Sequence, residues 1–108
     1  MSWDVSLEFD KCDHCEKTQE SVEVRNVTYN NSKIFTRLGV HPSQLDGLVA
    51  KDVVPRLKRA LELSQQIEAE LVTMEPPNKW GGLSDSRHFI ERLLVCCETN
   101  PDGRISVH

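Results

Sequence analysis

Cys12, His14 and Cys15 lie close together in the short segment CDHC. Two thiolates separated by two residues can bind one metal ion from a tight turn, as they do in zinc knuckles. A closed tetrahedral site requires two more ligands, and the sequence has no second C-x2-C pair. Two interpretations therefore stay open: an ordinary loop that contains two thiols, or a structural zinc bound by Cys12, Cys15 and His14.

The other two cysteines, Cys96 and Cys97, are adjacent in a segment with helical spacing of apolar residues. Neighbours on a helix point about 100° apart, so one ion is not easily bound by both. Cys97 falls on the apolar stripe, where a free cysteine is usually a small core residue. A redox role for the CDHC pair is disfavoured, because thioredoxin-like pairs lie at a helix N-terminus and polar residues leading into a strand follow this one.

No catalytic motif appears among the remaining reactive residues. The four histidines are scattered, and the sequence contains neither H-E-x-x-H nor G-x-S-x-G. The glycines of WGG do not match a phosphate-binding loop of known type. A binding protein is therefore favoured over an enzyme, although this absence alone does not decide the question.

The segment NVTYNNS, residues 26–32, follows a strand pattern but is rich in amides and hydroxyls. If the strand alternation continues past Val24, Asn26 and Thr28 lie on the core face and Val27 points away from it. Buried amides and hydroxyls cost free energy unless they are hydrogen-bonded. We therefore expect either a β-bulge that resets the register or specific partners for these groups.

Two kinds of partner are consistent with this composition. In the first interpretation, Asn26, Thr28 and Asn30 satisfy backbone groups of the later loop EPPNKWGG, as caps and turns do. In the second, NVTYNNS and NKWGG line a polar pocket for a nucleotide-like or other polar ligand, with Tyr29 and Trp80 as aromatic walls. The candidate ligand-binding residues are Asn26, Thr28, Tyr29, Asn30, Asn78 and Trp80.

Three strands are predicted to position these residues. The first alternates apolar and polar residues from residue 2 to residue 10, with Trp3, Val5, Leu7 and Phe9 apolar. The second carries Val22 and Val24 after a polar loop, which indicates an antiparallel hairpin with a long connection. The terminal RISVH alternates again and predicts a final strand.

Helices are predicted between the second and third strands. The first covers residues 32–39, capped by Asn31 or Ser32 and ended by Gly39. The main helix covers roughly residues 50–65, and Pro55 is interpreted as marking its first turn. Its stripe consists of Val53, Val54, Leu57, Leu61 and Ser64, and the apolar pattern extends or restarts through Ile67, Leu71 and Met74 until Pro76.

A third helix is predicted to begin near Ser84 or Asp85, either of which can cap it. It directs Phe89, Ile90, Leu93, Leu94 and Cys97 inward. The order β-β-α-α-α-β predicts an α+β fold, with a small three-stranded antiparallel or mixed sheet and helices on one face. A chain of 108 residues is expected to form a single globular domain, residues 1–108.

Composition limits the partners of this domain. A formal net charge of −4 argues against nucleic-acid binding, which requires clustered Lys and Arg. The one basic cluster, Arg56-Leu57-Lys58-Arg59, lies on a predicted helix among acids and is interpreted as a solvated helix face. No apolar run approaches the roughly 18 residues of a membrane span, and MSWDVSLEF does not resemble a signal peptide, so we expect a cytoplasmic protein with no membrane partner.

Four segments carry a resemblance to known sequences: MSWDVSLEFD, NVTYNNSKIF, PPNKWGGLSDSRHFIERLL and CCETNPDGRISVH. In this order they resemble a family of short uncharacterised proteins of tailed bacteriophages and prophages. That family has an MSWDVSL-like start, a central N-x-T-Y-N, a later N-x-W-G and an N-P-D turn before the last strand. The sequence departs from it at Asn31, Lys79 and the Leu83-Ser84 pair. The resemblance implies a phage or prophage setting and no established activity.

Two functions are therefore expected. The first is a non-enzymatic protein-binding module of a phage or prophage, an accessory or anti-defence protein that occupies a host or phage protein in the host cytoplasm. The alternative is a small-molecule binder that holds a polar ligand between NVTYNNS and NKWGG.

Overall fold

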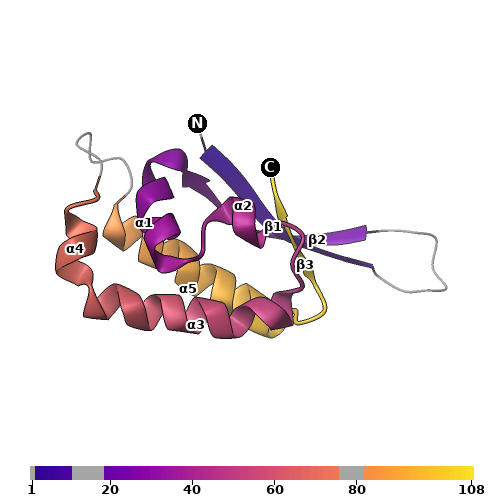
Figure 1. Cartoon of the computed structure of the whole chain (residues 1–108). Coiled ribbons are helices and arrows are strands. Elements are labelled where there is room, and N and C mark those ends of the chain that lie inside the picture. The colour runs from indigo at the N-terminus through magenta and orange to yellow at the C-terminus, as the bar shows by residue number, and fades with distance from the viewer. Residues whose placement is uncertain (1, 11–18, 76–81) are drawn as a thin grey trace.

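A computed structural model describes residues 2–10, 19–75 and 82–108 of the chain. Its elements are β1 (Ser2–Asp10), β2 (Gln19–Thr28), the 3-10 helix η1 (Tyr29–Asn31), α1 (Ser32–Leu38), α2 (Pro42–Leu45), α3 (Ala50–Gln66), α4 (Glu68–Val72), α5 (Leu83–Thr99) and β3 (Arg104–Val107) (Figure 1). None of the helices in these ranges is long and apolar enough to cross a membrane.

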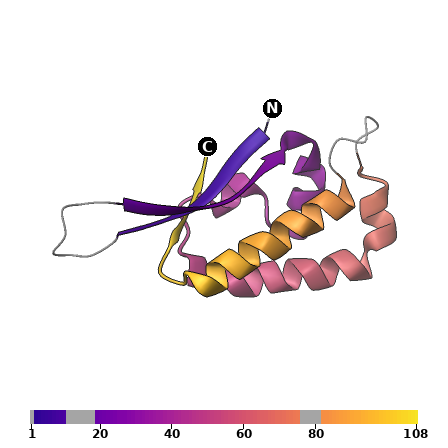
Figure 2. The same cartoon turned by 180° about the vertical axis from the view of Figure 1, so that it is seen from behind.

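The strands form a three-stranded sheet in the order β2-β1-β3, and both pairings are antiparallel. The helices cover one face of this sheet, with α3 and α5 side by side beneath it (Figures 1 and 2). This arrangement confirms the predicted α+β fold, and the last strand returns beside the first. The far end of the β1–β2 pair extends beyond the helices (Figure 1).

The core lies between the sheet and the helices. The alternation in β1 directs Val5 and Leu7 toward the helices, where both are buried, while Ser2 and Asp4 remain exposed on the outer face. From the helices, Phe35 and Phe89 meet with ring centroids 5.3 Å apart. The other fully buried side chains include Ile34, Leu45, Leu57, Leu71, Ile90, Leu93 and Ile105. Removal of this apolar surface from water is the main force that holds the helices on the sheet.

The main helix begins where the sequence predicted, but Pro55 does not mark its first turn. Because α3 begins at Ala50, Pro55 lies in the second turn, where it cannot donate a hydrogen bond to the preceding turn. The first turn is stabilised from outside the helix. The N–H of Ala50 donates to the carbonyl of Gly103 over 2.7 Å, and that of Lys51 donates to the carbonyl of Pro101 over 3.1 Å. These tertiary contacts let the helix begin one turn before the proline.

The end of α3 is attached to α5 through Ser64, which is fully buried as its place on the apolar stripe predicted. Arg87 donates from Nη2 to the carbonyl of Ser64 over 2.7 Å and from Nε to its Oγ over 3.1 Å. The same guanidinium contacts Glu68 at 2.8 Å. The helix then breaks at Ile67 and restarts as α4, which is one of the two predicted continuations.

Cys97 in α5 is buried, as predicted for a core cysteine. Burial raises the pKa of its thiol from 9.0 to about 12, and the neighbouring Cys96 and Glu98 add to this shift. The folded state therefore holds the thiol proton more tightly than the unfolded state does. The resulting contribution to stability is complete below pH 9.0 and is lost as the pH rises toward 12.

We expect the free energy of unfolding, measured by urea titration at several pH values, to decrease as the pH rises above about 9. Cys97→Ala should show a smaller decrease over the same interval, because the shifted thiol is gone. Cys96→Ala, at the half-buried neighbouring position, is the matched control and should retain most of the decrease. An unchanged pH dependence in Cys97→Ala would contradict this assignment.

Candidate functional site

A β-bulge at Val24 resets the register of β2 before the segment NVTYNNS. Val5 pairs with Arg25 and the next residue, Ser6, pairs with Glu23, so Val24 is the extra residue on β2. Beyond the bulge Val27 faces the core and is buried, and Asn26 lies on the exposed outer face. The sequence predicted either a β-bulge or specific partners for inward polar groups, and the structure contains the bulge.

Helix α5 holds this bulge through two arginines. Arg25 follows Val24 and extends to α5, where its Nη2 lies 2.5 Å from Oδ1 of Asp85 and its Nη1 lies 3.4 Å from the Asp85 carbonyl oxygen. In the opposite direction, Nε of Arg92 on α5 donates to the carbonyl of Val24. A bulge disrupts the local ladder, and Arg92 gives the Val24 carbonyl a partner outside the sheet.

Asn31 is the buried amide of the NVTYNNS segment. Its side chain is fully buried, with Nδ2 donating to Oδ2 of Asp85 over 2.8 Å and Oδ1 accepting from the N–H of Gly82 over 2.6 Å. Asn31 and Arg25 both bind Asp85, and the four residues Arg25, Asp85, Asn31 and Gly82 form one polar network. The sequence predicted only a helix cap at Asn31, and at that position its side chain makes no cap hydrogen bond.

The predicted caps of the last helix, Ser84 and Asp85, are wrong. The helix begins at Leu83, and Gly82 precedes it with a φ of 118°, a conformation that favours glycine. The N–H groups of Gly82 and Leu83 donate instead to side chains of residues that precede the helix in the chain. Asn31 accepts from Gly82, and Oε1 of Glu75 accepts from the N–H of Leu83 over 3.0 Å. Asp85 is therefore available for the network.

The candidate residues of NVTYNNS do not converge on one point. Asn26 donates from Nδ2 to Oγ of Ser2 over 3.0 Å and to Oδ1 of Asp4 over 2.6 Å, on the outer face of the sheet. Oγ1 of Thr28 accepts from the N–H of Asn30 over 3.3 Å and so caps η1. The other candidates, Asn78 and Trp80, lie outside the described residues, so a pocket shared with NKWGG remains a prediction.

The predicted metal ligands Cys12, His14 and Cys15 also lie outside the described residues. Within the ranges that the structure describes, no group of three or more His, Cys, Asp or Glu side chains is placed to hold a metal ion. A structural zinc and an ordinary loop both stay open as interpretations of CDHC.

Tyr29 packs against Trp3, for which the sequence predicted a place on the inward face of the first strand. Its ring centroid lies 4.2 Å from that of Trp3, and 41% of Tyr29 is exposed. Trp3 also contacts His41 edge-on, with centroids 5.0 Å apart. Trp3 is the first inward residue of β1 and lies at the end of the sheet, where burial is incomplete. That position in the sequence was the available indication that its ring could contact Tyr29.

One edge of the sheet is covered by the segment that precedes α3. The N–H of Ile105 donates to the carbonyl of Leu48 over 2.9 Å, and the carbonyl of Ile105 accepts from Gly47 over 2.7 Å. Oδ1 of Asp46 accepts from the N–H of Val107 over 3.0 Å. The outer side of β3 is therefore occupied along most of its length.

The opposite edge, formed by β2, is open among the described residues. Asp4 exchanges both backbone hydrogen bonds with His108, at 2.8 and 2.9 Å, so it has none left for its β2 partner Asn26. In an antiparallel ladder the residue of such a non-hydrogen-bonded pair directs its own N–H and C=O away from the neighbouring strand. Asn26 therefore presents its N–H and C=O to the open edge, and two residues later Thr28 presents its N–H, while the Thr28 carbonyl begins η1.

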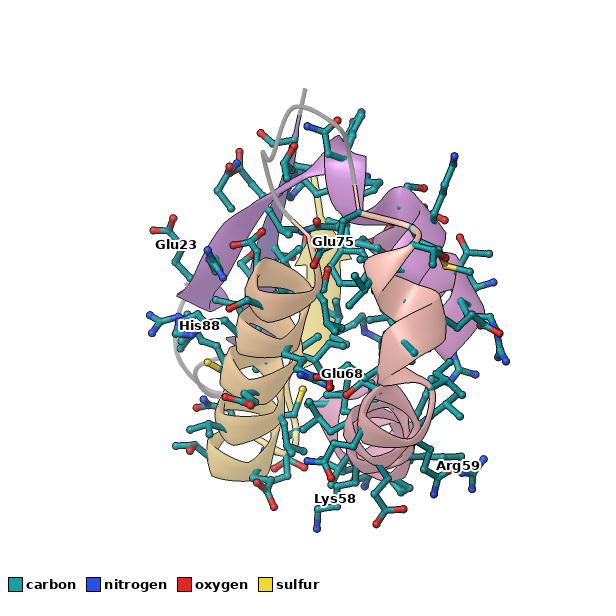
Figure 3. The ribbon with its side chains drawn as sticks, turned by 90° about the vertical axis from the view of Figure 1, so that its left-hand side faces the viewer. Glu23, Lys58, Arg59, Glu68, Glu75 and His88 are labelled. Carbon is teal, nitrogen blue, oxygen red and sulfur yellow. The ribbon has the colours of Figure 1, made fainter. Side chains whose placement is uncertain are left out.

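A groove of about 460 Å³ lies next to this open edge. Its walls come from β2 and α5, and its lining consists of Glu23, Val24, Arg25, Asn26, His88 and Arg92. Figure 3 shows Glu23 and His88 on the same side of the molecule. The open strand edge and a helix thus border one shallow polar groove.

No family model matches the chain, and no curated protein or solved structure matches it. The function is therefore inferred from the fold and from the groove, edge and network described above.

Asn31→Ala removes both hydrogen bonds of the buried amide and leaves the Gly82 N–H without its partner. We expect a loss of about 3 kcal/mol in the free energy of unfolding, measured by urea denaturation, because an unsatisfied buried group retains its desolvation cost. Asn26→Ala is the matched control and should cost less than about 1 kcal/mol, since that amide is exposed. Equal losses in the two variants would show that the network does not stabilise the fold.

Proposed function

We propose that this chain is a non-enzymatic protein-binding module that receives an extended segment of its partner on the open edge of β2. The observation that carries this proposal is the asymmetry of the sheet. One edge is covered by residues 46–49, whereas the other presents the backbone of Asn26 and Thr28 beside a groove. Strand addition of this kind is a common mode of peptide recognition, in which main-chain hydrogen bonds supply affinity and adjacent pockets supply specificity.

The groove between β2 and α5 would receive alternate side chains of the added segment. Side chains of a strand alternate between the two faces of the sheet, so one in two points toward α5. There it would meet His88 and Arg92 from the helix, with Glu23 at the rim. This lining is polar, which favours a polar side chain of the partner over a large apolar one.

The bulge limits the length of the added strand, because regular pairing requires a regular edge. Each backbone hydrogen bond contributes a net of about 1 kcal/mol, so a short ladder alone gives weak binding. Additional contact is available next to the edge, since Tyr29 directly follows Thr28 and its ring packs against that of Trp3 at a tilt of 43°. Half-exposed aromatic residues of this kind are enriched at the energetic centres of protein interfaces.

We propose a phage or prophage setting for this module, with a host or phage protein as its partner in the host cytoplasm. The support is the resemblance of four segments, in order along the chain, to short tailed-phage proteins. Two of these segments contain NVTYNNS and the N-terminal half of α5, which border the open edge and the groove.

Thr28→Pro tests the proposal, because it removes one outward N–H without forcing a new backbone conformation. Thr28 has a φ of −72°, which a proline ring adopts, and proline is tolerated at a strand edge. In affinity capture from a lysate of the bacterial host, we expect Thr28→Pro to lose about tenfold or more of the partner that the wild-type chain enriches, measured by quantitative mass spectrometry.

Thr28→Ala is the matched control, since it removes the same cap hydroxyl but keeps the N–H. It should capture the same protein at nearly the wild-type level, and both variants should give the circular-dichroism spectrum of a folded chain. Equal capture by Thr28→Pro, or the absence of any reproducibly enriched protein, would contradict strand addition at this edge.

A second candidate function, a small-molecule binder, is supported by the exposed ring of Tyr29 on Trp3, which can stack on a planar ligand. We expect such a ligand to raise the melting temperature in a thermal-shift screen of nucleotides and cyclic nucleotides, and Tyr29→Ala to abolish the rise. The control Val95→Ala removes an exposed apolar side chain of α5 instead, and it should preserve the rise in melting temperature. No shift with any nucleotide, or an undiminished shift in Tyr29→Ala, would eliminate this candidate.

A further inference from the structure

We propose a second binding site, in which Arg56 and Arg59 of α3 hold an acidic segment of a partner protein. The two arginines line a hollow of about 660 Å³ together with Leu38, Gly39, Gln44 and Leu63. This site is separate from the open edge of β2. Figure 3 shows Arg59 on the side of the molecule opposite to Glu23 and His88.

The arginines of this chain divide into two groups by the acceptors they contact. Five of the seven have an acceptor within the described residues: Arg25 contacts Asp85, Arg37 contacts Glu70, Arg87 contacts Ser64 and Glu68, Arg92 contacts Val24, and Arg104 contacts Gly47. Arg56 and Arg59 make no hydrogen bond or ion pair with any described residue. The two arginines that have no acceptor among the described residues therefore line the same hollow.

Local acids are available to Arg56 and Arg59 but are not used. Asp52 lies four residues before Arg56 and Glu62 lies three residues after Arg59, which are spacings that allow ion pairs on a helix surface. Neither pair forms among the described residues. Lys58, between the two arginines in sequence, instead pairs with Glu98 of α5 at 3.6 Å. The cluster that the sequence suggested to be one solvated face is therefore divided, and its two arginines border the hollow.

The chemistry of the lining indicates the occupant. A guanidinium presents paired N–H donors that match the two oxygens of a carboxylate. Leu38 and Leu63 provide apolar surface next to these donors. The complementary ligand is a peptide segment with acidic side chains on either side of an aliphatic one. A nucleic acid is a poorer match, because the chain has a net charge of −4 and two cations do not form the extended basic surface that phosphate backbones require.

A direct test uses a fluorescein-labelled peptide in which two glutamates flank a leucine at helical spacing. Fluorescence anisotropy should show binding to the wild-type chain, and the double variant Arg56→Ala/Arg59→Ala should bind about tenfold or more weakly. The matched control is Lys33→Ala/Lys51→Ala, which removes the same charge from exposed positions outside the hollow and should bind nearly as the wild type does. Arg56→Lys/Arg59→Lys keeps the charge but loses the bidentate donors, and it should fall between the two.

Three results would overturn this inference. The first is no binding of the peptide to the wild-type chain at millimolar concentration. The second is that Arg56→Ala/Arg59→Ala and the control Lys33→Ala/Lys51→Ala weaken binding equally, or that a peptide with glutamine in place of glutamate binds equally well. Either result would show that the hollow does not recognise carboxylates. The third is tighter binding of inorganic pyrophosphate than of the peptide, which would assign the hollow to a small anion. The Thr28→Pro variant should bind the acidic peptide as the wild type does, so this site and the β2 edge are tested independently.

Discussion

The hydrogen-bond network Arg25–Asp85–Asn31–Gly82 is the constraint on which the arrangement of this fold depends. It connects β2 and the adjoining 3-10 helix to the start of α5, and each of its hydrogen bonds joins residues more than fifty positions apart in the chain. Because Asp85 accepts from Arg25 and Asn31 at once, the bulge and the start of α5 hold each other in place. Buried polar groups that are fully satisfied specify one packing arrangement, since any other arrangement leaves them without partners. No buried side-chain nitrogen or oxygen in the described chain lacks a partner.

The alternation of β1 and the helical stripes were sufficient to predict the order of the three strands and of α1, α3 and α5, the inward Val5 and Leu7, and the end of α1 at Gly39, but η1 and α2 were not predicted. These features follow from local periodicity and from the backbone freedom of glycine, both of which are readable from a single sequence. The bulge was predicted only as one of two alternatives, because the alternation breaks after Val24 without showing where the extra residue lies. The roles of Asn31 and Glu75 could not be predicted. Each accepts from the N-terminus of α5 from outside the range of local capping rules, Asn31 from 51 residues away and Glu75 from eight, and those rules pointed instead to Ser84 and Asp85.

For the candidate site as well, local sequence indicated the segment, but the contacts of its residues depend on strands and helices that are distant in the chain. The unusual composition of NVTYNNS predicted unusual polar contacts, and the structure has there the cap of η1 and the buried amide of Asn31, directly after the bulge at Val24. The role of each residue depended on the partner strand. Asn26 is exposed because the bulge reverses its side, and its backbone faces the open edge because Asp4 is already paired with His108. The groove beside that edge requires α5, whose position no strand pattern specifies.

The covered edge of β3 has a consequence for self-association. If two copies joined through their β2 edges, the combined sheet would end on both sides at a β3 strand whose outer groups are already bonded to residues 46–49. Such a two-fold contact closes on itself, whereas an edge that is open on both sides can add copies without limit. The segment before α3 therefore acts as a terminator, and this sheet can form a discrete pair but cannot grow into a fibre through its edges.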